Sequence, residues 1–303
     1  PTQKEAVTPS PETPKYGGIL ALAQSTDPIR FTTIEASQST INEALVNEEL
    51  WGGDWTKGIA GGYGTKETDW VGSSNLWHLD AGIIAESTKW TLDEAKNGGT
   101  IVYQIRQGVH YALNPKSEAS RLVGGRELTA DDVIFHLKRL ITDTAAFVYQ
   151  STPGLRVAEI TKTGPWQITV KVTLENLISA IDRFGDSAKL VPPEVVQKYG
   201  GQKSWRESVG TGPFMLTEYV AGSQMVFDKN PNYWMKDPIG PGKGSQLPYL
   251  DSVRVLIIPD ASTQQAAMRT GKIGQIDRLA MEDAELMKRT APGLKEYEVQ
   301  GEL

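Results

Sequence analysis

Histidines and paired carboxylates are the side chains in this sequence whose types suit acid–base chemistry or metal binding. The histidines are His78, His110 and His136, and no two of them have the spacing of metal ligands. The adjacent Asp131 and Asp132 stand at the start of a predicted helix, where anionic groups complement the helix dipole. We therefore expect no metal site and no catalytic acid–base pair.

The motifs that mark other enzyme classes are also missing. The chain has no Cys, which excludes zinc–thiolate sites, thiol catalysis and disulfides within it. The glycine-rich stretch 52–64 lacks both the P-loop and the dinucleotide-binding spacing, and no G-x-S-x-G elbow occurs. These observations predict a protein that is not an enzyme and that uses no cofactor.

Composition indicates a globular protein that does not bind nucleic acid. The 303 residues are 39% hydrophobic and 22% charged, with a net charge of −6 and no run of Lys and Arg. No apolar run approaches the roughly 20 residues of a membrane span. Residues 1–15 hold four Pro and cannot bury enough apolar surface to fold. We interpret them as a disordered tether, suited to a lipid-anchored protein; a disordered tail without that role is the alternative.

Aromatic residues gather in one part of the chain. Residues 52–75 predict a long glycine-rich loop, of the length that is usually functional or mobile. Such a cluster either packs in a core or forms a wall around a ligand, because ligand pockets are mostly apolar. Its members between residues 51 and 77 are Trp51, Trp55, Tyr63, Trp70 and Trp77.

Strands and helices alternate along the rest of the chain, which predicts an α/β class. The segment 127–141 has the clearest helix pattern, with Thr129 and Asp132 placed as a capping box. Further helices are predicted at 41–51, 190–201 and 261–270. Strands are predicted at 17–24, 100–106, 166–173, 213–220, 224–230 and 252–259.

Seven segments, in order along the chain, resemble the family-5 extracellular solute-binding proteins, the oligopeptide-, dipeptide- and nickel-binding group of ABC importers. The longest are GRELTADDVIFHLKRL, GTGPFMLTEYVAGSQMVFDKNPNYW and LPYLDSVRVLIIPDASTQQAAMRTGKIGQID. The sequence departs from the pattern of the family in two places, because the stretch 114–125 is expanded and the loop 52–75 is longer than usual. The matching segments lie at 16–23, 27–31, 84–90, 103–111, 125–140, 210–234 and 247–277.

The resemblance implies a type II periplasmic-binding-protein fold of cluster C. Lobe I would be discontinuous and would consist of residues 16–45 and 196–303. An inserted subdomain would occupy residues 46–195. Members of the family are longer, so the second lobe would follow Leu303 and is absent from this sequence. Either the sequence was cut, or the protein lost that half.

The resemblance also implies a function in transport. The protein would capture a peptide, or a similar small solute such as a metal chelate, outside the membrane and deliver it to the permease of an ABC importer. It would be periplasmic or at the cell surface, anchored through a lipid on a removed or missing N-terminal segment. The alternatives are an oligosaccharide-binding protein of the same architecture, a glycosidase-type enzyme, and a surface protein without a transport role.

We expect the solute site on the lobe I surface that faces the second lobe. The proposed residues lie in the loop after the first strand and among aromatics near the domain junction. Asp27 or Glu35 would pair with a ligand amine through a charge-assisted hydrogen bond; the alternative is that both serve only the turn and the surface. The full set is Ser25, Thr26, Asp27, Phe31, Glu35, Trp51 and Trp55.

Overall fold

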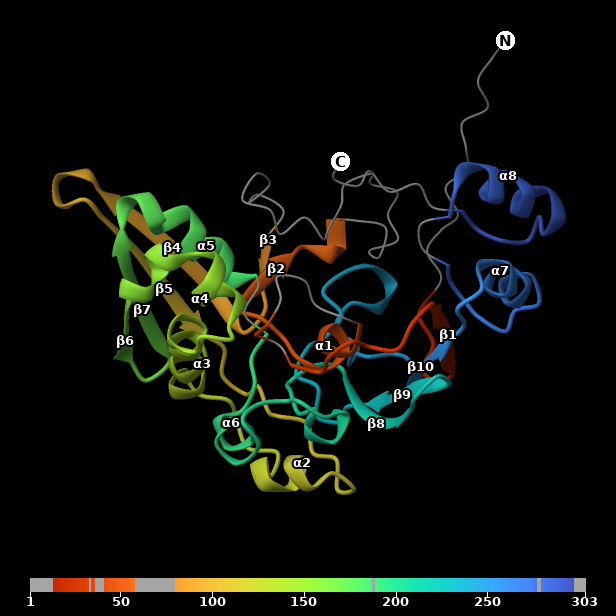
Figure 1. Cartoon of the computed structure of the whole chain (residues 1–303), viewed down its shortest axis with the longest axis horizontal. Helices are drawn as coiled ribbons and strands as arrows, with labels where there is room; N and C mark the ends of the chain where they lie inside the picture. Colours follow the sequence, from red (N-terminus) through yellow and green to blue (C-terminus); the bar gives the residue numbers. More distant parts are fainter. Residues whose placement is uncertain are drawn as a thin grey trace, which may run out of the picture.

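The computed structural model describes residues 13–32, 34–35, 41–57, 80–186, 189–276 and 279–296. They form two four-stranded sheets and one two-stranded sheet. Figure 1 shows the two larger sheets on opposite sides of the molecule, with α1 between them. Most of the tether predicted at 1–15 and most of the loop predicted at 52–75 lie outside the described residues.

The first sheet joins strands from both ends of the chain. Its order is β1 (Ile19–Gln24), β10 (Ser252–Ile257), β9 (Gln224–Lys229), β8 (Phe214–Val220). β1 is parallel to β10, and the other two pairs are antiparallel. On the outer side of β1, the Gly274 amide donates to the Ala21 carbonyl at 2.7 Å. The four predicted strands are therefore confirmed, each within about two residues at either end.

The second sheet is antiparallel and comes from one continuous stretch. Its order is β4 (Ala85–Asp93), β5 (Gly98–Ile105), β7 (Gln167–Thr173), β6 (Glu159–Gly164). The sequence predicts β5 and β7 but not β4 or β6. Thr169 of β7 is buried, and its hydroxyl lies 2.9 Å from the Thr163 hydroxyl. A small third sheet pairs β2 (Trp51–Gly53) with β3 (Asp80–Gly82).

Helices cover these sheets. α3 (Ala130–Thr142) has the predicted capping box, in which the Asp132 carboxylate accepts the Thr129 amide at 2.7 Å. The predicted helices near 190–201 and 261–270 are α6 (Pro193–Tyr199) and α7 (Ala261–Arg269). The sequence does not predict α2 (Glu118–Val123), α4 (Phe147–Ser151), α5 (Leu177–Gly185) or α8 (Met281–Thr290). None of the helices in the described ranges has the length and apolar content that a bilayer crossing requires.

The helix predicted at 41–51 is wrong in its second half. α1 (Ile41–Val46) ends five residues early, because the backbone that follows pairs with a distant segment. The Leu190 amide donates to the Glu48 carbonyl at 2.9 Å, and the Leu50 amide donates to the Gly185 carbonyl at 3.1 Å. The segment 47–50 therefore lies beside Gly185, at the end of α5, and beside Leu190.

Buried apolar residues form two clusters. The larger lies around the second sheet and the helices that cover it, and the smaller lies between the first sheet and α1. Ile34 and Val209 belong to the larger cluster, although both lie in segments assigned by the sequence to lobe I. The division into 16–45 plus 196–303 and 46–195 stays a prediction.

Candidate functional site

The turn that follows β1 carries three of the predicted ligand-binding residues. Ser25 and Thr26 form a bend in which the Gln24 side-chain amide donates to the Thr26 carbonyl at 2.7 Å. The Asp27 carboxylate accepts the Tyr219 hydroxyl at 2.9 Å and the Gly222 amide at 3.0 Å. Asp27 therefore fastens this turn to the turn between β8 and β9.

Replacing Asp27 with Ala is expected to lower the free energy of unfolding by about 1–2 kcal/mol, because two donors lose their acceptor. Asp27→Asn keeps one acceptor oxygen and is the matched control, with a smaller loss. Urea denaturation of the three proteins measures the difference. Equal midpoints for wild type and Asp27→Ala would show that this anchor contributes nothing to stability.

Phe31 and Glu35 have contrasting surroundings. Phe31 is buried in the smaller apolar cluster, where its ring meets that of Tyr219 edge to face at 5.5 Å between centroids. Glu35 is exposed. Burial lowers the pKa of Arg139, and the negative charges of Asp143 and Glu35 oppose this shift. Of the two carboxylates proposed to bind an amine, Glu35 is therefore the more accessible.

The two predicted tryptophans lie in different places. Trp51 is only 4% exposed and packs in the larger cluster, where Gly185 leaves room for its indole ring. Trp55 begins the short 3-10 helix η1 (Trp55–Lys57) and lines a surface pocket. The pocket also includes Tyr249 and Leu250, which precede β10, whereas Ser25–Asp27 follow its parallel neighbour β1. The predicted residues therefore do not converge on one site, and their contact with a solute stays a prediction.

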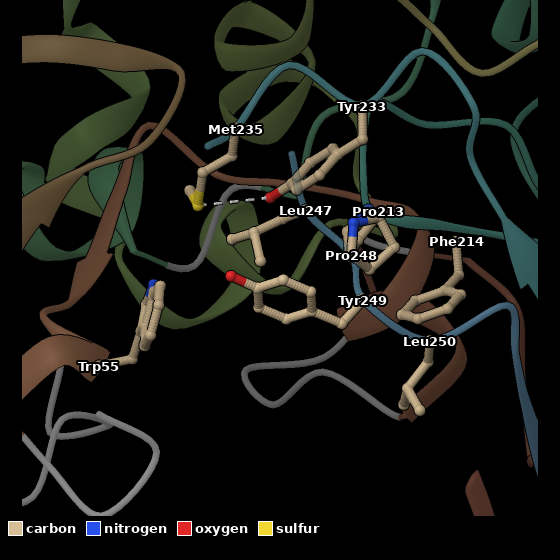
Figure 2. Close-up of a pocket in the computed structure, with 9 residues that line it drawn as sticks. All are labelled: Trp55, Pro213, Phe214, Tyr233, Met235, Leu247, Pro248, Tyr249 and Leu250. Carbon is tan, nitrogen blue, oxygen red and sulfur yellow. Dashed lines mark hydrogen bonds between the residues drawn. The ribbon is translucent and has the colours of Figure 1, made fainter. Parts of the chain in front are cut away.

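The pocket is apolar and has a volume of about 320 Å³. Figure 2 shows Trp55 on one side of the pocket and Tyr249 across from it, with the hydroxyl end of the tyrosine directed toward the tryptophan. The tyrosine hydroxyls in the lining are already bonded: that of Tyr233 donates to Glu48 at 2.9 Å, and that of Tyr249 donates to Asp237 at 2.7 Å. The lining residues are Trp55, Pro213, Phe214, Tyr233, Met235, Leu247, Pro248, Tyr249 and Leu250.

A buried glutamate, Glu48, lies behind this pocket and links Tyr233 and Trp234 to the segment 47–50. Glu48 accepts the Tyr233 hydroxyl and, at 2.9 Å, the Trp234 indole N–H. Burial raises the pKa of Glu48, while the two donors and the nearby Lys189 act in the opposite direction. The neighbouring Glu49 forms a buried ion pair with Lys189 at 2.8 Å. These contacts assign both carboxylates a structural role.

Replacing Glu48 with Leu is expected to cost about 2 kcal/mol, because the partly buried Trp234 N–H loses its acceptor and the buried Tyr233 hydroxyl keeps only the weak Met235 sulfur at 3.8 Å. Glu48→Gln keeps an acceptor oxygen and should stay within about 1 kcal/mol of wild type. Chemical denaturation at neutral pH distinguishes them, and equal losses would contradict this role of the carboxylate.

The same variants test the direction of the pKa shift. With its pKa raised in the folded state, Glu48 contributes stability that is present below its ordinary pKa of 4.5 and is lost as the pH rises through the folded pKa. Glu48→Gln should therefore lose less stability than wild type as the pH rises from acid to neutral.

Sequence reasoning missed Glu48 and most of the pocket. Tyr233 and Trp234 stand in one of the segments that resemble the family, but their partner is far away in the sequence. The pocket combines η1 with the residues before β10, which only the folded chain brings together. Within the described ranges, no three His, Asp or Glu side chains gather in a way that would hold a metal ion.

Comparison with known proteins gives consistent matches. The family model "Bacterial extracellular solute-binding proteins, family 5 Middle" matches residues 81–301. The di/tripeptide-binding protein 1 of Pseudomonas aeruginosa is 27% identical over 207 residues, covering 62% of this chain and 34% of the relative. A putative binding protein of Brucella melitensis is 28% identical over 133 residues, covering 44% of this chain and 21% of the relative.

Solved structures match over most of the chain. The oligopeptide-binding protein AppA of Bacillus subtilis, in complex with a nonapeptide, has a TM-score of 0.65 at 19% identity, covering 91% of this chain and 47% of AppA. DppA of Helicobacter pylori, in complex with the peptide STSA, has a TM-score of 0.63 at 18% identity, covering 91% and 49%. The chain thus spans about half the length of these structures, and the fold class predicted from the sequence is confirmed.

Proposed function

Because the chain belongs to the family-5 bacterial extracellular solute-binding proteins, we propose that it is part of the solute-binding component of an ABC importer. It captures a peptide or a similar small solute outside the membrane and delivers it to the permease. Binding and release complete this task, and no bond is made or broken. A lipid anchor on the N-terminal side holds the protein at the membrane.

One observation carries the proposal: the family match over residues 81–301 coincides with a fold shared with two peptide complexes. The AppA structure contains a nonapeptide and the DppA structure contains the peptide STSA. A peptide solute is therefore favoured over a sugar for this chain.

The mechanism follows from a trap of two lobes. The solute binds one lobe, the second lobe closes by a hinge motion, and the solute shifts the equilibrium because it binds the closed form better. In this chain the turn Ser25–Asp27 and the exposed Glu35 form the wall supplied by lobe I. Since the Asp27 carboxylate already accepts two hydrogen bonds, Glu35 is the partner for a cationic ligand amine.

A thermal-shift screen tests the proposal, with dipeptides, longer peptides, oligosaccharides and Ni²⁺ chelates as ligands. It compares this chain with a longer version that carries a second lobe. A ligand at a hundredfold excess over its Kd stabilises the native state by about 2.7 kcal/mol. Peptides should raise the melting temperature of the longer version. A rise with oligosaccharides alone, or turnover of a test substrate without binding, would overturn the proposal.

A further inference from the structure

The second sheet has an open edge at β4. In the part of the chain that the structure describes, β5 is the only strand that pairs with β4. Figure 1 shows the β4–β5 hairpin at the outer side of this sheet, where it projects beyond the helices. Every second residue of an antiparallel edge strand directs its N–H and C=O away from the sheet. β4 therefore presents a row of backbone donors and acceptors that a further strand can bond.

This edge lacks most of the features that keep edge strands apart. β4 has nine residues and no Pro, and its pairing with β5 is regular from Ser87 to Asp93. Its one register shift lies at the beginning, between Ala85 and Ser87. Natural edge strands are usually short or carry Pro or a bulge, because a long regular edge is a template for pairing. What remains is the charge of Lys89 in the middle of the strand, so the partner must supply its counter-charge.

Two apolar side chains of β4 extend past the helix that covers the sheet. Trp90 lies opposite Ile101 and Leu92 lies opposite Gly99, so each pair shares one face. α5 covers that face, because a Cβ on Gly99 would contact Leu177. Ile101 is fully buried, whereas Trp90 and Leu92 are 44% and 52% exposed. The apolar layer under α5 therefore reaches the edge of the sheet without being fully covered.

A second copy of β4 complements this edge. A two-fold axis perpendicular to the sheet keeps the apolar faces of both copies on the same side and makes the two strands antiparallel. With the axis at Thr91, Trp90 of each copy lies opposite Leu92 of the other. Lys89 of each copy then lies opposite Asp93 of the other. The contact therefore joins two half-exposed apolar pairs and two pairs of opposite charge.

The charges of β4 select this register over its neighbours. An axis at Lys89 would place the two copies of that lysine opposite each other, and an axis at Trp90 or Leu92 would leave Lys89 without a charged partner. Opposite charges across two strands stabilise a sheet, and like charges destabilise it. The Asp93 carboxylate contacts Lys96 at 3.0 Å but is still 46% exposed, so it can accept a second cation.

We propose that the β4 edge is a homodimer interface, in which two copies of this chain pair β4 with β4 about a two-fold axis at Thr91. The two four-stranded sheets become one continuous sheet, with Trp90 and Leu92 of both copies between the two α5 helices. Assembly stops at two chains, because the two-fold contact uses this edge in both copies. The first sheet, with the turn Ser25–Asp27, lies on the opposite side of the molecule (Figure 1) and stays accessible.

Sedimentation equilibrium of the 303-residue chain, from about 10 µM to about 1 mM, tests for the dimer. We expect a reversible equilibrium between one and two chains, with a Kd on the order of 0.1 mM, because a single pair of strands buries little surface. Lys89→Glu places acidic residues opposite each other twice in the dimer and should weaken it about tenfold or more. Lys116→Glu makes the same charge change at an exposed position outside β4 and should leave the dimer unchanged.

Disulfide crosslinking tests the register, and the chain has no Cys of its own to interfere. Opposite Cα atoms of antiparallel strands lie about 4.5–5.5 Å apart, which is within the range of a disulfide. Thr91→Cys should therefore yield a covalent dimer on mild oxidation, seen on a non-reducing gel. Ser87→Cys is the matched control on the same strand and the same face. Its two copies would lie roughly 25 Å apart along the strands, too far to be bridged.

The proposal is overturned if the chain stays monomeric at about 1 mM, if Lys89→Glu dimerises as well as wild type, or if Ser87→Cys crosslinks as efficiently as Thr91→Cys. A mass that keeps growing with concentration would also contradict it, because pairing of β4 with a different edge, such as β6, does not close. So would a longer version with a second lobe that remains monomeric. Circular dichroism shows whether each variant is folded. The thermal-shift test of solute binding does not depend on any of these results, so the two proposals fail separately.

Discussion

Gly185→Ala is expected to destabilise the protein by about 3 kcal/mol, which is the upper end of what overpacking a core costs. A methyl group at residue 185 would overlap the indole ring of buried Trp51. Neither partner can move away easily, because the Gly185 carbonyl also accepts the Leu50 amide at 3.1 Å. Urea denaturation of variant and wild type measures the loss.

A double variant shows whether the clash with Trp51 is the cause. Trp51→Leu makes room for the new methyl group, so Gly185→Ala should cost less in that background, with a coupling of about 1–2 kcal/mol. Gly98→Ala is the matched control, since its nearest neighbour, the Lys96 carbonyl, would lie at an ordinary 3.8 Å. Additive losses at residues 51 and 185 would contradict the assigned contact.

Acid should unfold this protein mainly through His136. The side chain is fully buried on α3, and neither ring nitrogen has a hydrogen-bond partner among the described residues. Burial lowers its pKa from 6.5 to about 3, and the charge of Arg139 adds to this. Between these two pH values the unfolded chain binds a proton at His136 and the folded chain does not. The free energy of unfolding therefore falls as the pH drops from 6.5 toward 3. At about 1.4 kcal/mol per pH unit, the loss reaches roughly 4 kcal/mol.

His136→Leu removes this proton and keeps a side chain of similar size. We expect its unfolding free energy at pH 7 to match or exceed that of wild type, because an unpaired polar group leaves the core. Its acid midpoint should move to lower pH in a circular-dichroism titration. His110→Gln, at an exposed position, is the control and should follow wild type. If His136→Leu unfolds at the same pH as wild type, other groups govern acid unfolding.

The elements that the sequence predicts correctly are those whose signal is local. α3 carries its capping box and apolar stripe within one segment, and β5 and β7 alternate in a regular way. β4 is an edge strand with most of its side chains exposed, so it lacks the alternation that identifies a half-buried strand. The end of α1 depends on pairing with residue 190, which no local pattern contains.

The site was harder to predict for the same reason. Asp27 lies in the turn that the family resemblance implies, but its hydrogen bonds to Tyr219 and Gly222 come from a distant strand and turn. The aromatic cluster left open whether its members pack or bind. In the structure the two tryptophans differ in their surroundings, because Trp51 packs against Gly185 whereas Trp55 lines a surface pocket. Sequence spacing alone does not contain that distinction.

The pairing of β1 with β10 also sets an order of events during biosynthesis. The second sheet needs only residues 85–173 and gains many contacts at short chain separation, so we expect it to form first. β1 emerges earlier, but both of its neighbours, β10 and the Gly274 region, come from near the other end of the chain. Until these arrive, its apolar sequence ILALA is an unpaired strand that other nascent chains can extend. A chain that stops before Ser252 never acquires β10, so β1 stays unpaired. Premature termination would therefore promote aggregation through β1, in addition to removing the later residues.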